Sequence, residues 1–163
     1  MERCCSLALQ ESDMVEVSSL YYDEQVRQFL GGPVSNEQYL RSFQAMISAQ
    51  AQHQGYYFAV RLLADHQLIG LVSLDPHHDI AAWELSYQFL PAFWKQGYAT
   101  EALTHLLQFG FQNLKLGHIV AETQAANLNS CRLLEYLGFQ KLRQVVRFGN
   151  LQIIYECKQS SWQ

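Results

Sequence analysis

The sequence lacks the features that mark several common classes of protein. Its 11 lysines and arginines are outnumbered by 15 acidic residues, giving a net charge of −4, whereas a nucleic-acid-binding surface is usually basic. The four cysteines form no C-x-x-C pair, so we expect no zinc or redox motif and reduced thiols in a cytoplasmic protein. Glu2 and Glu11 interrupt the start of the chain, so we expect no signal peptide. The uncharged stretch 42–60 is rich in glutamine, so we expect no membrane-spanning segment.

Neither the composition nor the pattern indicates disorder or several domains. Hydrophobic residues make up 49% of the 163 residues and aromatic residues 13%, which is typical of a folded chain. A chain of this length buries about two thirds of its unfolded surface when it folds as one unit. The sequence has no internal repeat and no linker-like segment, so we expect a single domain over residues 1–163.

The stretch from Trp83 to Leu107 changes its hydrophobic period part-way along. At first, polar residues at every second position alternate with apolar and aromatic ones, which predicts a strand over 83–90, and Pro91 ends it because proline cannot donate to a ladder. From Ala99 onward the apolar residues follow helical spacing. A strand is therefore expected to run through a short turn into a buried helix.

The turn before this helix suits an anion. The first turn of a helix has about four N–H groups without partners, and the helix dipole adds partial positive charge there. No Ser, Thr, Asp or Asn stands between Ala92 and Ala99 to cap those groups, whereas Lys95 adds a cation and Gly97 has no Cβ to block approach. Considered alone, these residues fit a phosphate cradle or an ordinary helix start.

The rest of the chain divides into further strands and helices. Hydrophobic alternation predicts strands at 4–9, 56–63, 68–74, 118–123, 141–148 and 151–158, the last two joined by a Gly149-Asn150 turn. Helical spacing predicts helices from Met14, at 23–30, after Ser35, from Ala99 to Leu114 and after Asn127. The strand at 118–123 follows a strand and a helix, so it should pair in parallel with the 83–90 strand. The fold class is α+β: a three-layer arrangement in the order β-α-α-β-β-β-α-β-α-β-β, with a mixed, mostly antiparallel sheet of about seven strands and helices on both faces.

Two blocks of the sequence resemble motifs of the GNAT superfamily, the acyl-CoA-dependent N-acetyltransferases. The segment 94–103, WKQGYATEAL, resembles the pyrophosphate-binding motif Gln/Arg-x-x-Gly-x-Gly/Ala, with Gly97 and Ala99 at the last two fixed positions and Trp94 in place of Gln or Arg. The segment 127–139, NLNSCRLLEYLGF, resembles the N-x-x-S-x-R-x-L-E-K-L-G-F signature of the branch that acetylates ribosomal-protein N-termini. The two blocks stand in the family's order and spacing, so the resemblance implies one N-acetyltransferase domain.

The resemblance also implies where acetyl-CoA would bind. In the family, pantetheine lies along the strand before the cradle, which corresponds here to backbone groups of Phe89 and Leu90 that a bulge or divergence from the next strand would free. Asn127 and Ser130 match a polar pair that lines the cofactor, and simple helix capping is the alternative; we expect Asn127 to do both. The phosphates would lie on the cradle residues Lys95, Gln96, Gly97, Tyr98, Ala99 and Thr100.

Two features bear on proton transfer. Glu84 alternates away from its apolar neighbours on the central strand and is the candidate general base, with an exposed or salt-bridged glutamate as the alternative. Many family members carry a tyrosine as general acid in the last helix, but alignment places Leu134 there, and Tyr136 points about 200° away from that position. The proton for the leaving group is then expected from Ser86, Tyr87 or water.

Two neighbouring histidines, His77 and His78, stand between aspartates and invite a metal interpretation. Adjacent residues on a proline-containing turn point in different directions, whereas metal ligands usually come from spaced positions on fixed elements. We therefore expect a solvated turn over 75–79 and no metal.

The resemblance implies an enzyme that takes acetyl-CoA and a primary amine, as a monomer or a homodimer, without nucleic-acid or membrane partners. An α-amine has a pKa near 7.8 and a lysine-like amine one near 10.4, so the α-amine needs about 3.5 kcal/mol less for deprotonation. We therefore expect a protein or peptide N-terminus as the acceptor, and the resemblance implies that residues 21–54 form one wall of its site. A small-molecule amine is the alternative acceptor, and a non-catalytic acyl-CoA-binding or interaction domain is the alternative function, because the usual tyrosine is missing.

Overall fold

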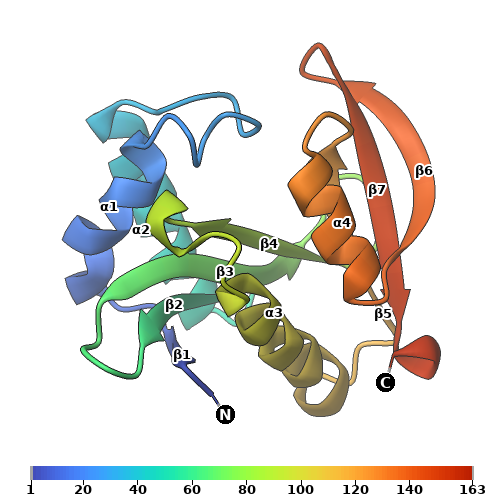
Figure 1. Ribbon diagram of the computed structural model, residues 1–163, viewed down its shortest axis with the longest axis horizontal. Coiled ribbons are helices and arrows are strands. Elements are labelled where there is room, and N and C mark those ends of the chain that lie inside the picture. Colours follow the sequence, from blue (N-terminus) through green and yellow to red (C-terminus); the bar gives the residue numbers. More distant parts are fainter. Residues whose placement is uncertain (1, 163) are drawn as a thin grey trace.

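The computed structural model describes residues 2–162, in which seven strands form one sheet with α-helices packed against it (Figure 1). The strands are β1 (Cys4–Ala8), β2 (Tyr56–Leu62), β3 (Leu68–Pro76), β4 (Trp83–Phe89), β5 (His118–Gln124), β6 (Gln140–Arg147) and β7 (Asn150–Lys158). The α-helices are α1 (Met14–Tyr22), α2 (Asn36–Ala51), α3 (Tyr98–Gln108) and α4 (Leu128–Tyr136). The predicted order of strands and helices is confirmed, except for the helix that was expected over residues 23–30.

The sheet has the strand order β1-β2-β3-β4-β5-β7-β6, and neighbouring strands are antiparallel except for β4 and β5. The predicted parallel pairing of β4 with β5 is confirmed. It covers only two positions, where Trp83 lies opposite Ile119 and Glu84 opposite Val120. Beyond these positions the two strands separate, at a place that we call the fork. On its other edge β4 stays paired with β3 along its whole length, so the fork opens the sheet in its middle.

Helices cover both faces of the sheet, as expected, with two α-helices on each face (Figure 1). On one face, α1 and α2 pack through buried side chains that include Leu20, Phe43 and Leu71. On the other face, α3 and α4 pack through a larger cluster that includes Leu103 and Leu134. No helix among residues 2–162 is both long and apolar enough to cross a bilayer.

The alternation of β4 divides its side chains between these two faces. Leu85 and Phe89 are buried in the cluster beneath α3 and α4. Because side chains alternate along a strand, Glu84, Ser86 and Gln88 point to the face that carries α1 and α2. Glu84 therefore lies on that face at the last paired position before the fork.

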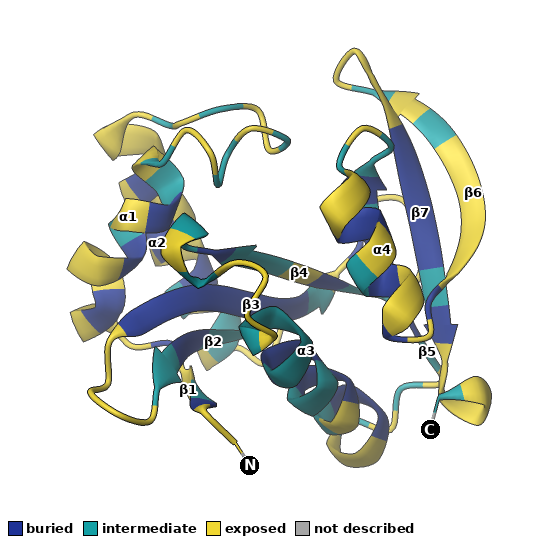
Figure 2. Ribbon diagram, viewed as in Figure 1, coloured by how far each residue is buried: buried dark blue, intermediate teal, exposed yellow. Residues whose placement is uncertain are grey.

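The strand at the far edge, β6, is exposed along most of its length, whereas β7 is buried through its middle (Figure 2). The hairpin between them turns through Phe148 and Gly149, whose φ angles are 54° and 74°. This turn lies one residue earlier than the expected Gly149-Asn150 turn. The left-handed region suits glycine and is rarely adopted by phenylalanine, which is why the sequence did not indicate it.

The helix predicted over residues 23–30 is wrong, because this segment forms a series of turns. Asp23 Oδ1 accepts a hydrogen bond from the Val26 N–H at 2.8 Å. The Arg27 guanidinium donates to the carbonyls of Leu30 at 2.7 Å and Gly32 at 3.0 Å. These side chains take backbone groups that a helix would pair with one another, which favours turns over a continuous helix.

Two further boundaries differ from the expectation. β3 continues through Pro76, and Asp75 pairs with Glu84, so the turn expected at 75–79 begins later. The helix expected to run to Leu114 ends as an α-helix at Gln108 and continues as a π-helix over Phe109–Asn113. A single turn of π-helix changes the spacing of apolar residues very little, so the sequence pattern does not distinguish it from a continuing α-helix.

Candidate active site

A cleft of about 580 Å³ opens at the fork. Ser86 and Glu122 line it from the face of the sheet that carries α1 and α2, and Tyr87 and Thr123 line it from the opposite face. The cleft therefore passes through the sheet, so two reactants can approach the same point from opposite sides. Figure 1 shows α1 and α4 on opposite sides of this region.

The predicted cradle forms one end of the cleft. Gly97 is the N-cap of α3 with φ 85°, and no side chain caps the helix. Lys95, with φ 58°, also adopts the left-handed region, and Lys95, Gly97, Ala99 and Thr100 all line the cleft. Uncapped N–H groups, the positive end of α3 and a lysine thus face one space, which is an arrangement that binds phosphate.

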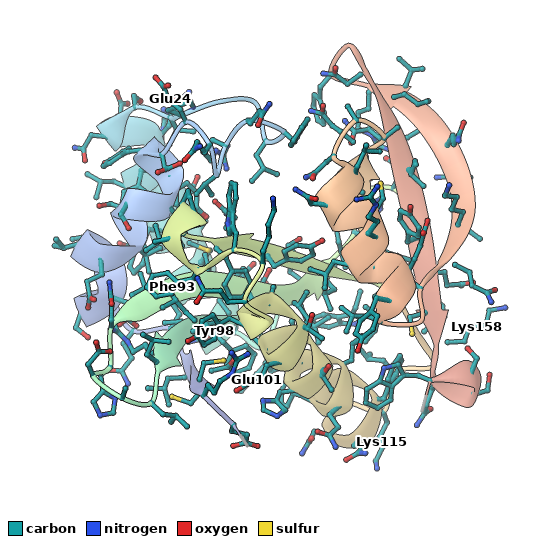
Figure 3. All side chains as sticks on the ribbon, in the orientation of Figure 1. Glu24, Phe93, Tyr98, Glu101, Lys115 and Lys158 are labelled. Atoms are coloured by element: carbon teal, nitrogen blue, oxygen red, sulfur yellow. The ribbon has the colours of Figure 1, made fainter. Side chains whose placement is uncertain are left out.

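Two of the predicted cradle residues point elsewhere. The Gln96 side chain donates to the Ala92 carbonyl at 2.7 Å. The Tyr98 ring packs edge-to-face against Phe93 (Figure 3). The Arg3 guanidinium lies over the Tyr98 ring at 4.4 Å from its centre. Any contact of Gln96 or Tyr98 with a phosphate is therefore expected through the backbone, and their roles stay predictions.

Some of the backbone N–H and C=O groups at the end of β4 already have hydrogen-bond partners. The Leu90 N–H donates to the Ile69 carbonyl at 2.9 Å, and the Phe93 N–H donates to the Leu90 carbonyl at 3.0 Å. Because hydrogen-bonded pairs alternate along an antiparallel ladder, the N–H and C=O of Phe89 point toward the fork. The Phe89 carbonyl accepts from the Trp94 indole N–H at 2.7 Å. Divergence of the strands thus leaves the Phe89 N–H for a ligand, while both backbone groups of Leu90 are engaged.

The predicted polar pair on α4 also faces the cleft. Asn127 caps α4, as predicted, because its Oδ1 accepts from the Ser130 N–H at 3.2 Å. Ser130 Oγ lies 2.5 Å from the Tyr87 hydroxyl, so β4 and α4 are joined across the cleft. Leu134, one turn further along α4, is buried, and Tyr136 is 78% exposed and points away, as expected. Tyr87 and Ser130 therefore bring two hydroxyl groups together between β4 and α4.

Glu84 lies in a cluster of carboxylates just beneath the cleft. Burial raises the pKa of Glu84 to about 7, and Asp75 and Glu122 add to the shift, while a hydrogen bond from the Glu122 backbone and the charge of Arg147 oppose it. Glu84 is not among the described residues that line the cleft, but Ser86 next to it on the same face is. A carboxyl group with a pKa near neutrality beside a cleft is typical of a general base.

Glu122, on β5, is held in place by two partners. His77 Nε2 lies 2.8 Å from one of its carboxylate oxygens, and Arg147 Nε lies 3.2 Å from the other. Arg147 also contacts Asp79 at 2.6 Å, which ties the end of the β6–β7 hairpin to the loop after β3. The carboxylate of Glu122 thus reaches the cleft already paired.

His77 is buried, which corrects the expectation of a solvated turn. Its Nδ1 accepts hydrogen bonds from the N–H groups of Asp79 and Ile80, each at 3.1 Å, so Nε2 carries the proton that it donates to Glu122. His77, His78 and Glu122 lie close enough together to suggest three metal ligands. Both ring nitrogens of His77 are already engaged, so this group does not fit a metal ion.

Sequence reasoning indicated one wall of the cleft and missed other lining residues, among them Glu122 and Trp94. Residues 25–30 form part of its wall, within the longer segment 21–54 that was expected there, and the Gln124 side chain donates to the Phe29 carbonyl at 3.1 Å. Glu122 is a charged residue in a mostly buried strand, and this is the signal that could have identified it. Trp94 had no such signal beyond its departure from the family motif.

Comparison with known proteins gives consistent results. The family model described as acetyltransferase (GNAT) domain matches residues 6–140. An uncharacterised N-acetyltransferase of Bacillus subtilis, YoaA, is 26% identical over 136 residues, which cover 80% of this chain and 76% of the relative.

Among solved structures, a ribosomal-protein-S5-alanine acetyltransferase from Vibrio fischeri has a TM-score of 0.80 at 17% identity, covering 100% of this chain and 97% of that one. A spermidine N-acetyltransferase from Vibrio cholerae, in complex with CoA and spermine, has a TM-score of 0.84 at 19% identity, covering 98% of this chain and 97% of that one. At these identities the two structures share the fold with this chain, and they differ from each other in their acceptors.

Proposed function

The chain belongs to the acetyltransferase (GNAT) family, and we propose that it transfers the acetyl group of acetyl-CoA to the α-amine of a protein or peptide N-terminus. N-acetyl transfer from acetyl-CoA follows from membership of this family. The choice of an α-amine is our proposal and depends on the charge of the cleft.

The cradle and the fork supply what acetyl-CoA needs. We expect the phosphates at the start of α3, where Lys95 and Gly97 line the cleft. The pantetheine would follow the open edge of β4 toward Phe89, whose N–H is positioned to donate to the thioester carbonyl and to the negative charge that develops there. Asn127 and Ser130 would border it from α4.

The choice of an α-amine as the acceptor depends on the charged residues that line the cleft. Among the described residues that line the cleft, Glu122 is the one carboxylate, and it is paired with His77 and Arg147. The same lining also carries a cation, Arg27, in the segment expected to border the acceptor. A polyamine brings several positive charges and favours several free carboxylates, whereas a peptide N-terminus brings one charge that is lost before reaction. The lining therefore suits the α-amine.

Glu84 provides a base of matching strength. Its pKa of about 7 lies close to that of an α-amine, near 7.8, so proton transfer from the amine costs little free energy. Because Glu84 lies behind the lining, we expect it to accept the proton through an intervening water. A lysine-like amine near 10.4 would add several kcal/mol to the same step.

A competition between amines tests the proposal. The protein is incubated with acetyl-CoA and a mixture of spermidine, an aminoglycoside and short peptides that carry both a free N-terminus and a lysine. Fragment masses then locate the acetyl group on the α-amine or on the lysine side chain. The same mixture without protein gives the chemical background.

We expect acetyl groups above background on peptide α-amines alone. Transfer confined to spermidine, the aminoglycoside or lysine side chains would contradict the choice of acceptor and leave acetyl transfer standing. Tight acetyl-CoA binding with no transfer to any amine would support the non-catalytic alternative.

A further inference from the structure

Two hydroxyl groups meet across the cleft, one from each side of the fork. The Tyr87 hydroxyl on β4 and Ser130 Oγ on α4 lie 2.5 Å apart, and both residues line the cleft. Asn127 fixes the Ser130 end of this pair by accepting from its backbone N–H. The pair therefore occupies a defined position beside the open edge of β4, where the reacting end of a bound thioester would lie.

The hydrogen bond between Tyr87 and Ser130 uses only one of their two hydroxyl protons. Two hydroxyl groups carry two protons, and a single hydrogen bond between them uses one. Within residues 2–162, neither oxygen has a further hydrogen-bond partner. When Ser130 donates to Tyr87, the phenolic proton of Tyr87 is free to point into the cleft.

The surroundings keep that proton on the phenol at neutral pH. Burial raises the pKa of Tyr87 to about 12, and the hydrogen bond from Ser130 opposes the rise because it stabilises the phenolate. A phenol is also a stronger acid than the aliphatic hydroxyls of Ser86, Thr100 or Thr123, which line the same cleft. Tyr87 is thus protonated before the reaction and has a donor beside it that stabilises its anion.

We propose that Tyr87 is the general acid for the leaving thiolate, with Ser130 as the positioning residue that supports it. This role rests on the proposed acetyl transfer. As the carbon–sulfur bond breaks, its electron pair passes to sulfur, and the Tyr87 hydroxyl gives its proton to that sulfur while Ser130 donates to the phenolic oxygen. The phenolate regains a proton from water, and the proton lost by the amine leaves through Glu84, so the sum is one thioester and one amine converted to one amide and one thiol.

Two acetyl donors with different leaving groups distinguish a general acid from a residue that only supports the structure. The substitution Tyr87→Phe keeps the ring and removes the proton. With acetyl-CoA as donor it should lower turnover by about 100-fold. With 4-nitrophenyl acetate, whose leaving group departs without a proton, turnover should fall by no more than about threefold. Equal losses with the two donors would overturn the proposal.

A matched substitution controls for the loss of a buried phenol. Tyr155 is fully buried on β7, and its hydroxyl donates to Glu135 at 3.1 Å, outside the cleft. Tyr155→Phe therefore removes a buried hydroxyl and its hydrogen bond without touching the fork. Its turnover should match that of the parent protein with both donors.

Binding provides a readout that does not depend on turnover. Calorimetry compares CoA with desulfo-CoA, in which hydrogen replaces the thiol, at a pH where the free thiol is ionised. The parent protein should bind CoA about tenfold more tightly, because a hydrogen bond from Tyr87 to the thiolate is lost in desulfo-CoA. Tyr87→Phe should bind both about equally. An undiminished preference in Tyr87→Phe would place the sulfur elsewhere and contradict the proposal.

The outcomes distinguish this inference from the proposed function. A parent protein that transfers no acetyl group refutes both. An active parent whose Tyr87→Phe variant loses activity equally with both donors refutes the role of Tyr87 alone. If Tyr87→Phe does not fold, Ser130→Ala decides the question with the same donors, since its loss should be smaller and again confined to acetyl-CoA.

Discussion

Two glutamates of this chain, Glu84 and Glu101, lie in opposite surroundings. Glu101, on the first turn of α3, accepts hydrogen bonds from the N–H groups of Arg3 at 2.6 Å and Cys4 at 3.0 Å, and Figure 3 shows it on the side of α3 that faces β1. Burial acts to raise its pKa, but these hydrogen bonds outweigh burial and the pKa is lowered. Glu84, at the fork, is raised to about 7 by burial and by two neighbouring carboxylates.

The difference separates a structural carboxylate from one suited to proton transfer. The surroundings of Glu101 supply donors that stabilise the ion, so it fastens the start of β1 to α3. The surroundings of Glu84 disfavour the ion at neutral pH, which lowers the stability of the fold. Groups held in unfavourable ionisation states cluster at sites of function, and the fork is where this fold brings two reactants together.

The pH dependence of stability has opposite signs at the two positions. The folded-state pKa of Glu84 lies above its unfolded value of 4.5, so its contribution to stability is fully present below 4.5 and is lost as pH rises through about 7. The folded-state pKa of Glu101 is depressed, so its contribution is present above the unfolded value and is lost as pH falls through the folded value.

The largest expected effect is on turnover. Glu84→Gln keeps the shape of the side chain but cannot accept a proton, so kcat at pH 7 should fall by about 1,000-fold, within the range of a lost general base. Glu101→Gln, the same change at the structural position, should leave kcat within about threefold of the parent. Steady-state kinetics with acetyl-CoA and a peptide acceptor measure both, and equal losses in the two variants would remove the distinction between them.

The second effect is on stability, and it has the opposite sign for the two variants. At pH 8, Glu84→Gln removes a disfavoured charge and should raise the free energy of unfolding by on the order of 2 kcal/mol, while at pH 4 it should change little. Glu101→Gln weakens two hydrogen bonds to a charge and should lower it by about 1 to 2 kcal/mol at pH 8. Urea unfolding at both pH values measures these changes, and a Glu84→Gln variant less stable than the parent at pH 8 would contradict the account.

A third glutamate, placed at the cradle, is expected to weaken cofactor binding. Gly97→Glu would put a carboxylate against the expected phosphates and a Cβ 3.1 Å from the Arg3 guanidinium, so the Kd for CoA should rise by at least about 30-fold. Gly149→Glu is the matched control, because Gly149 also has a left-handed φ, of 74°, and open space around it. Calorimetry that finds the same affinity in both variants would exclude the cradle as the phosphate site.

The sequence predicted the parts of this molecule that depend on local pattern. The order of strands and helices, apart from the segment 23–30, and the Asn127 cap follow from neighbouring residues. The parallel pairing of β4 with β5 followed from their separation by a helix. These features were predictable because short-range spacing determines them.

The surroundings of the catalytic candidates were not predictable, because they join distant parts of the chain. His77, Glu122 and Arg147 lie on three different elements and meet only through the strand order. The raised pKa of Glu84 depends on its burial and on the charges of Asp75, across the β3–β4 ladder, and Glu122, beyond the fork. The sequence showed that Glu84 was polar on an apolar strand, and only the fold showed that its charge is disfavoured.

The ionisation of Glu84 itself tests the central claim most directly. Carbon-13 NMR can follow its side-chain carboxyl resonance from pH 3 to pH 9, with the assignment made from the resonance that Glu84→Gln removes. The account predicts a midpoint near 7 for Glu84, with Glu101 titrating below 4.5 in the same spectra. A Glu84 midpoint near 4.5 would mean that its surroundings accept the charge, and it would contradict the assignment of Glu84 as the base.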